Sequence, residues 1–349
     1  MTNKQIRISN LGTRNVGLDI LRIIAMLMVV LLHTLVFTGG LCSNIYSTQY
    51  LVSWCLNSLS YVAVNWFILI SGYFMVDKDF TDKKIFLLWI QIICYTVIGY
   101  VLLILIGIAD FSVYDLLKCI FPLLSRAYGF LSSYICMLLI SPYLNIVIKK
   151  LNSKELLKVT GILIILLSIL PTFFFWTGWK EPINGTGTVW YICLYFVASC
   201  YKRCHIPNIN KYWYLFVYLF LSMFNVSTLY IIRFISNILE LSTDYAEHFF
   251  QYISTTVFIA SVSLFLFFMN VGLKEGNLSC FINKISGLTL GVYLWHMRPV
   301  LKNLYQSLFH TELLAQQKYY FIYCLFIVIA VFIIGIAAEY LRKIAIDKI

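Results

Sequence analysis

An acid, a base and an imidazole lie in one apolar stretch near the start of the chain. The stretch LDILRIIAMLMVVLLHT, residues 18–34, contains Asp19, Arg22 and His33. In a helix, with about 100° and about 1.5 Å per residue, Arg22 and His33 lie within about 20° of one face and roughly 16 Å apart, and Asp19 shares that stripe. Imidazole suits general-base catalysis at physiological pH, and a guanidinium can orient an anionic group or stabilise a developing oxyanion.

Two interpretations of this stripe are open. Charged side chains within a membrane span are costly and typically face a protein interior or an aqueous cavity, which favours a functional site. In the alternative, Asp19 and Arg22 form an ion pair near the headgroups and His33 is a hydrogen-bonded core histidine. The alignment of three polar side chains on one face favours the first interpretation.

Hydroxyl side chains mark a second candidate segment, NWFILISGYFMVDK, at residues 65–78. Ser71 and Tyr73 flank Gly72, which permits close approach of another backbone. Substrate binding and simple helix packing explain this pattern equally well.

Two later segments add candidate binding residues. GVYLWHMRPV, residues 291–300, places His296 and Arg298 before a helix-breaking proline, which indicates a cavity rather than lipid. Trp190 and Tyr191 form either an interfacial aromatic belt, the simpler interpretation, or a platform on which a sugar stacks.

Transmembrane helices must position these residues. Of the 349 residues, 61% are hydrophobic and 12% charged, which excludes the soluble globular class. Apolar runs of about 20 residues, enough to cross roughly 30 Å of hydrocarbon, recur along the chain. We therefore expect an all-α integral membrane protein, a bundle of about ten transmembrane helices within a single domain over residues 1–349. The expected spans lie near 16–38, 51–76, 85–107, 127–148, 156–176, 187–202, 213–235, 248–270, 286–302 and 318–341.

The basic residues alternate between the loops of such a bundle. With a cytoplasmic N-terminus, 18 of the 26 Lys and Arg residues fall in cytoplasmic segments and 5 in outer segments. The positive-inside rule then predicts that both termini are cytoplasmic. The net charge of +11 is thus explained by membrane topology, and we expect no nucleic-acid partner.

The ten cysteines show no paired framework. The motif CYKRCH at 200–205 has no second ligand cluster, so we expect no bound metal. The first span is too long for the apolar core of a signal peptide and is expected to stay in the protein.

The chain resembles acyltransferase family 3, the integral-membrane O-acyltransferases that modify bacterial surface carbohydrates. The resemblance rests on several motifs that occur in the family's order along nearly the whole chain. They are LDILR at 18–22 followed by ten residues and His33, SGY at 71–73, SPYLN at 141–145, VWY at 189–191, and GVYLWH with a following proline near the C-terminus.

This resemblance implies a ten-helix fold that moves an acyl group, usually acetyl, from cytoplasmic acyl-CoA to a hydroxyl of a glycan or lipid-linked saccharide. It implies a multi-pass protein of the bacterial cytoplasmic (plasma) membrane, in contact with membrane lipid. Acetyl-CoA is the expected co-substrate, with no permanently bound cofactor. Arg22 and His33 match the family's paired essential residues, and Asp19 and Ser71 match further positions in its motifs.

The chain departs from the family after the second span. Many members have an Arg-x-x-Arg pair there, whereas this chain reads DKDFTDKKIF. Lys83 and Lys84 are the candidate phosphate-binding cations, although lysine is a point charge and not a bidentate fork.

The expected mechanism is O-acetyl transfer with His33 as general base on the acceptor hydroxyl. Arg22 would orient the donor or stabilise the oxyanion, and Asp19 would hold Arg22 in place. A polytopic glycan or lipid transporter or flippase without covalent chemistry is the alternative, since charges within spans fit it also. A structural or sensory subunit would need no polar stripe. The ordered motifs and the absence of internal repeats favour the enzyme.

Overall fold

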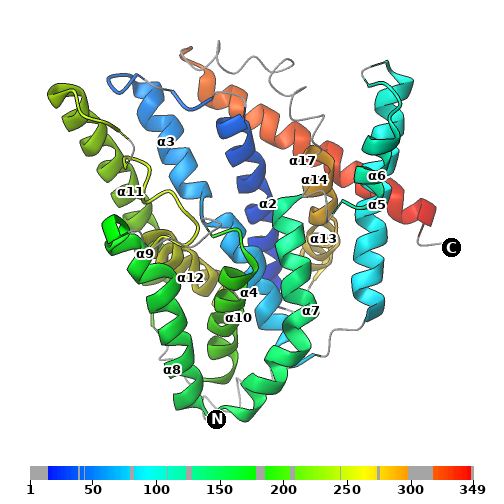
Figure 1. Cartoon of the computed structure of the whole chain (residues 1–349), viewed down its shortest axis with the longest axis horizontal. Coiled ribbons are helices and arrows are strands. Elements are labelled where there is room, and N and C mark those ends of the chain that lie inside the picture. Colours follow the sequence, from blue (N-terminus) through cyan, green and yellow to red (C-terminus); the bar gives the residue numbers. More distant parts are fainter. Residues whose placement is uncertain are drawn as a thin grey trace.

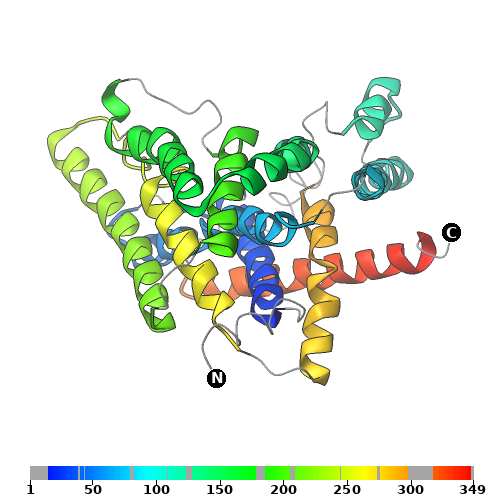
Figure 2. The ribbon, with the colours of Figure 1, turned by 90° about the horizontal axis from the view of Figure 1, so that it is seen from below.

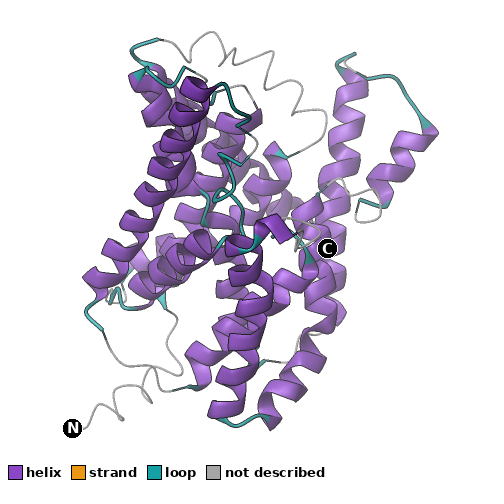
Figure 3. Ribbon diagram, turned by 60° about the vertical axis from the view of Figure 1, so that its left-hand side comes forward, coloured by secondary structure: helices purple, strands orange, loops and turns teal. Residues whose placement is uncertain are grey.

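The chain folds into a bundle of helices (Figure 1, Figure 3). A computed structural model describes residues 15–37, 40–42, 44–78, 82–107, 109–122, 128–177, 185–204, 209–243, 245–272, 276–297 and 317–346. All regular secondary structure in these residues is helical, which confirms the predicted all-α class.

Seven helical stretches of the described residues are long and apolar enough to cross a membrane. Two of them combine consecutive helices, because α3 leads into α4 and α8 continues through a π-helical turn, Ile165–Ile169, into α9. They are α2 (Val16–Phe37), α3 (Thr48–Ser60) with α4 (Ala63–Met75), α5 (Asp82–Leu105), α7 (Gly129–Lys150), α8 (Ser153–Ile164) with α9 (Leu170–Phe173), α11 (Lys211–Leu239) and α17 (Tyr320–Ile346).

The other three expected spans correspond to shorter helices. They are α10 (Thr188–Arg203), α12 (Thr255–Met269), and the pair α13 (Asn277–Ser286) and α14 (Thr289–His296). The span expected at 248–270 begins late because residues 249–254 form turns, although their composition is apolar. The number of ten spans and the cytoplasmic position of both termini stay predictions.

Several basic helix ends meet at one end of the bundle, called the basic end below. Asn145 in α7 donates to the carbonyl oxygen of Met75 at the end of α4 (3.0 Å). Lys202 at the end of α10 pairs with Asp77 (2.8 Å). The same helix ends carry Lys78, Lys149, Lys150, Lys154 and Arg203.

The opposite end of the bundle, called the far end below, is held by polar contacts between loops and helix ends. The Tyr320 hydroxyl, at the start of α17, donates to the carbonyl oxygen of Gly40, just beyond α2. Arg233, near the end of α11, donates to the Tyr50 hydroxyl in α3 (3.3 Å). Helix α2 therefore ends at the far end, and it begins toward the basic end, because Arg22 lies 6.0 Å from the ring of Phe74 near the end of α4.

Helix α2 lies inside the bundle, packed against α3, α4, α12, α13, α14 and α17 (Figure 1, Figure 2). Its interior has no proline, and Asn15 caps its first turn by accepting a hydrogen bond from the Leu18 amide (3.3 Å). By contrast, α5 and the short helix α6 (Val113–Ile120) stand at the edge of the molecule in both views.

A proline lies inside α7 within the SPYLN motif. Pro142 lacks the amide that would bond to the carbonyl of Leu138, four residues earlier. The Ser141 hydroxyl donates to that carbonyl instead (2.7 Å). In a membrane helix, where a lost backbone bond is costly, this serine explains why the proline is tolerated.

Candidate active site

The charged part of the predicted stripe lies toward the basic end. Arg22 donates from Nη1 to Asp19 Oδ1 (3.3 Å) and to the Ser286 hydroxyl (3.3 Å). Ser286, the last residue of α13, donates in turn to Asp19 Oδ1 (2.9 Å). The guanidinium lies 6.0 Å from the ring of Phe74, near the end of α4. Asp19 is buried, whereas about a quarter of the Arg22 side chain (26%) is exposed, so the cation has the better access to a ligand.

The imidazole part of the stripe lies toward the far end. His33 Nδ1 is 2.9 Å from Nε2 of His296, the last residue of α14. Nδ1 of His296 is 2.6 Å from the carbonyl oxygen of Val292, one turn earlier. His296 is almost fully buried (3% exposed), so protein atoms fix the orientation of its ring.

These contacts determine where the hydrogens lie when both rings are neutral. A carbonyl oxygen only accepts, so Nδ1 of His296 carries a hydrogen and Nε2 of His296 carries the lone pair. His33 Nδ1 must then donate to His296. The lone pair of His33 is consequently on Nε2, which is the nitrogen that can accept a proton from a substrate.

Both parts of the stripe face the same partner segment. Asp19 and Arg22 contact Ser286, and His33 contacts His296. Ser286 and His296 are the first and last residues of an eleven-residue stretch that runs from the end of α13 through α14. This arrangement confirms that the three polar residues share one helix face. Along α2, the guanidinium-bearing residue and the imidazole are roughly 16 Å apart.

The α13–α14 segment is itself closely packed against α17. If Gly291 carried a side chain, its Cβ would lie 2.3 Å from the Cβ of Glu339 in α17. If Gly335 in α17 carried one, its Cβ would lie 2.7 Å from the Cα of Val292 in α14. The two glycines therefore permit a backbone approach that positions His296.

The SGY motif supplies a hydroxyl and a packing surface. Ser71 Oγ is 2.9 Å from the hydroxyl of Tyr134 in α7. Tyr73 has its ring 6.1 Å from that of Phe265 and 5.4 Å from the Lys202 ammonium. Gly72 packs against α10, since an added Cβ would lie 3.0 Å from Cβ of Ala198. Helix packing thus accounts for the glycine, while substrate binding by the hydroxyls stays a prediction.

The aromatic belt suggested for Trp190 and Tyr191 is wrong. Both side chains are fully buried (0% exposed). Trp190 donates from Nε1 to Asn65 Oδ1 (3.0 Å), and Asn65 donates to the Ser261 hydroxyl (3.1 Å). Spacing could not reveal this burial, because it comes from the packing of α10 against α4, α7 and α8. Contact of these rings with a sugar stays a prediction.

The remaining predicted site residues lie elsewhere. Lys83 and Lys84 are exposed in the first turn of α5. Arg298 lies outside the described residues. Within the described part of the chain, no cluster of three or more His, Cys, Asp or Glu side chains could hold a metal ion.

A buried carboxylate on α17 was missed. Glu339 is 1% exposed and accepts hydrogen bonds from Gln91 (3.1 Å) and Tyr95 (2.9 Å) of α5. Arg342 pairs with both of its oxygens (2.8 and 3.0 Å). The sequence feature that could have identified it is an acidic residue near the end of the apolar run at 318–341, because an acidic residue in such a run usually faces the protein interior. The network joins α5 to α17.

The comparisons with known proteins bear on the chemistry of this site. A search of the curated proteins and one of the solved structures gave no match. The sequence model of the acyltransferase domain of acyltransferase family 3 matches residues 15–339, a range that includes Asp19, Arg22, His33 and His296. The chain therefore belongs to acyltransferase family 3.

Proposed function

We propose that this membrane acyltransferase moves an acetyl group from cytoplasmic acetyl-CoA to a hydroxyl of a surface or exopolysaccharide glycan. The observation that carries the proposal is the chain of hydrogen bonds from His33 through His296 to the carbonyl of Val292. It fixes one imidazole by a second one and directs a single basic nitrogen away from the pair. Such an orienting partner is the usual companion of a general base.

The reaction would proceed as a direct transfer. His33 Nε2 takes the proton of the acceptor hydroxyl as its oxygen forms a bond to the thioester carbonyl carbon. The tetrahedral intermediate collapses by breaking the carbon–sulfur bond, and the imidazolium returns the proton to the coenzyme A thiolate. His296 accepts from Nδ1 throughout, so it stabilises the imidazolium without exchanging a proton with the substrate.

Arg22 is assigned to the donor rather than to the oxyanion. Roughly 16 Å of helix separate it from His33, so one carbonyl carbon is poorly placed to contact both. Its partly exposed guanidinium lies near Phe74, toward the basic end, and suits the phosphates or carbonyl groups of the coenzyme. Lys83 and Lys84 would add long-range attraction for the same anion. The donor thus enters at the basic end and the acceptor at the far end.

The test is acetyl transfer by purified protein in detergent micelles. Labelled acetyl-CoA is supplied with surface glycan from the host, and release of coenzyme A and label on the glycan are both followed. His33→Ala is compared with the wild-type chain and with His248→Ala, a matched histidine that bonds to the carbonyl of Thr172 instead (2.8 Å).

We expect transfer in the wild type and in His248→Ala, and transfer that is slower by about 10²-fold or more in His33→Ala at equal amounts of folded protein. Full activity in His33→Ala would refute the general-base role. If the micelle assay shows no acetylation and no coenzyme A release, and the same protein in lipid vesicles moves glycan across the bilayer, the chain is a transporter instead.

A further inference from the structure

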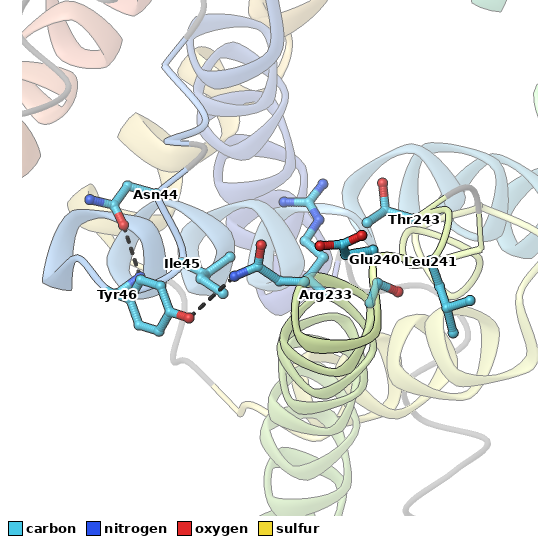
Figure 4. A pocket seen from close by; sticks show the side chains of 9 residues that line it. Asn44, Ile45, Tyr46, Arg233, Glu240, Leu241 and Thr243 are labelled. Atoms are coloured by element: carbon cyan, nitrogen blue, oxygen red, sulfur yellow. Dashed lines mark hydrogen bonds between the residues drawn. The ribbon is translucent and has the colours of Figure 1, made fainter.

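A polar pocket opens at the far end of the molecule, between the loop that follows α2 and the end of α11 (Figure 4). Its volume is about 710 Å³, which is within the range of sites for small ligands. Most of its lining side chains are polar, namely Asn44, Tyr46, Arg233, Ser236, Asn237, Glu240 and Thr243.

Protein contacts fix one wall of this pocket. Arg233 pairs with Glu247 (2.6 Å), and its guanidinium carbon lies 4.6 Å from the ring centroid of Trp54. Asn237 donates to the Tyr46 hydroxyl (3.2 Å), and the Tyr46 amide donates to Asn44 Oδ1 (3.1 Å). The side chains at the pocket mouth are therefore already oriented without a ligand.

The same side chains keep donors and acceptors for a ligand. Within the described residues, the amide nitrogen of Asn44, the amide oxygen of Asn237 and the carboxylate of Glu240 have no hydrogen-bond partner. A sugar hydroxyl both donates and accepts, so it can bond to groups of each kind. The Tyr46 ring is 68% exposed and offers an aromatic face to the C–H groups of a sugar.

Electrostatics disfavour an anion in the pocket. The charge of Arg233 is matched by Glu247, and Glu240 adds a carboxylate without an ion-pair partner among the described residues. A neutral ligand rich in hydroxyl groups meets no such repulsion.

Glu240 is also held in a backbone conformation that favours glycine. Its φ of 52° and ψ of 37° are in the left-handed region, and among the described residues it is the one non-glycine residue with a positive φ. A helix most often ends this way on glycine. A strained acidic residue at the mouth of a polar pocket is a feature of functional sites.

We propose that this pocket binds a neutral saccharide unit of the acceptor glycan, at a site separate from His33. The identity of the ligand as acceptor rests on the proposed acetyltransferase function. The pocket and His33 are both at the far end, because the pocket residues Asn44 and Tyr46 lie within ten positions of the end of α2 at Phe37. One sugar of the chain would be held here while a hydroxyl of another sugar reaches His33.

The test uses protein purified in a detergent without a sugar headgroup. Neutral oligosaccharides released from the host surface polysaccharide are the probe, and binding is measured by saturation-transfer NMR and calorimetry. Glu240→Gln and Asn44→Ala are compared with Gln317→Ala, an exposed polar residue at the same end but outside the pocket. A fourth variant, Glu240→Gly, removes the carboxylate and relieves the left-handed strain.

We expect Glu240→Gln and Asn44→Ala to weaken oligosaccharide binding about tenfold and to raise the KM for glycan, with kcat and the KM for acetyl-CoA unchanged. Glu240→Gly should bind the oligosaccharide as weakly as Glu240→Gln does, but it should unfold at the same temperature as the wild type or a higher one. This result would separate a binding role of Glu240 from a structural one. Gln317→Ala should match the wild type.

Unchanged binding in the pocket variants, or no oligosaccharide binding by a wild type that still acetylates glycan, would overturn the pocket alone. Binding that is lost in the pocket variants without any release of coenzyme A would leave the pocket in place and overturn the acetyltransferase.

Discussion

The two ends of α2 contact the same partner segment through different kinds of side chain. At the basic end, Asp19 and Arg22 form an ion pair joined by the Ser286 hydroxyl. At the far end, His33 meets a second histidine, and the chain of hydrogen bonds ends on a backbone carbonyl. The first end has a guanidinium, which is suited to binding an anionic group, and the second has a pair of imidazoles, which are suited to proton transfer. If the proposed function is correct, binding of the donor and activation of the acceptor are divided between the ends of one helix.

The largest effect should come from removing the base. His33→Ala should lower kcat by about 10²–10⁴-fold, the usual contribution of general-base catalysis, with little change in the KM for acetyl-CoA. Initial rates of acetyl transfer, measured over a range of acetyl-CoA concentrations with protein shown to be folded, give both kcat and KM. A His33→Ala enzyme with a large rise in KM and normal kcat would reverse the proposed division.

The next effect concerns the histidine that orients the base. His296→Ala removes the acceptor for His33 Nδ1 and should lower kcat about 10–100-fold, since a hydrogen bond to a charged group contributes about 1.5–3 kcal/mol. His296→Gln offers an amide oxygen in place of Nε2 and should restore part of the loss. Equal kcat values for the two variants would show that His296 contributes packing only.

A smaller effect is expected at the charged end. Arg22→Ala removes the ion pair and hydrogen bond that the guanidinium makes with the buried Asp19, so the variant should lose about 2 kcal/mol of stability and show about a tenfold higher KM for acetyl-CoA. Thermal unfolding and initial rates measure the two quantities. The double variant Asp19→Asn, Arg22→Gln should recover stability but not the KM, because it removes the buried carboxylate together with the guanidinium.

The smallest effect should come from the exposed lysines of α5. Replacing Lys83 and Lys84 with glutamine should raise the KM for acetyl-CoA about two- to fivefold at low salt, because exposed charges contribute less than about 1 kcal/mol each. The difference should vanish near 1 M salt, where the screening length is about 3 Å. A loss of activity that persists at high salt would place these lysines in direct contact with the donor.

Local periodicity predicted the helix that carries the site. The span expected at 16–38 is α2 at Val16–Phe37, and the shared face of Asp19, Arg22 and His33 follows from the helical repeat. These features depend on neighbouring residues only. The family resemblance, drawn from ordered motifs, is confirmed by the match over residues 15–339.

Long-range pairing was beyond the reach of the same reasoning. His296 was identified as a binding residue, but its contact with His33, 263 positions away, depends on how α14 packs against α2. The burial of Trp190 depends in the same way on α4. Glu339 bonds to Gln91 and Tyr95 of α5, which precede it by 248 and 244 positions. Hydropathy reports that such residues avoid lipid, and it does not identify their partners.

The placement of Ser286 and His296 on one short segment has a thermodynamic consequence. A ligand that shifts this segment at Arg22 also changes the position of the ring that orients His33. Occupancy of the two ends is then linked, and the linkage must be reciprocal: coenzyme A would change the affinity for glycan by the same factor by which glycan changes the affinity for coenzyme A. Through this segment the enzyme would sense a bound donor on one side of the membrane before it engages an acceptor on the other.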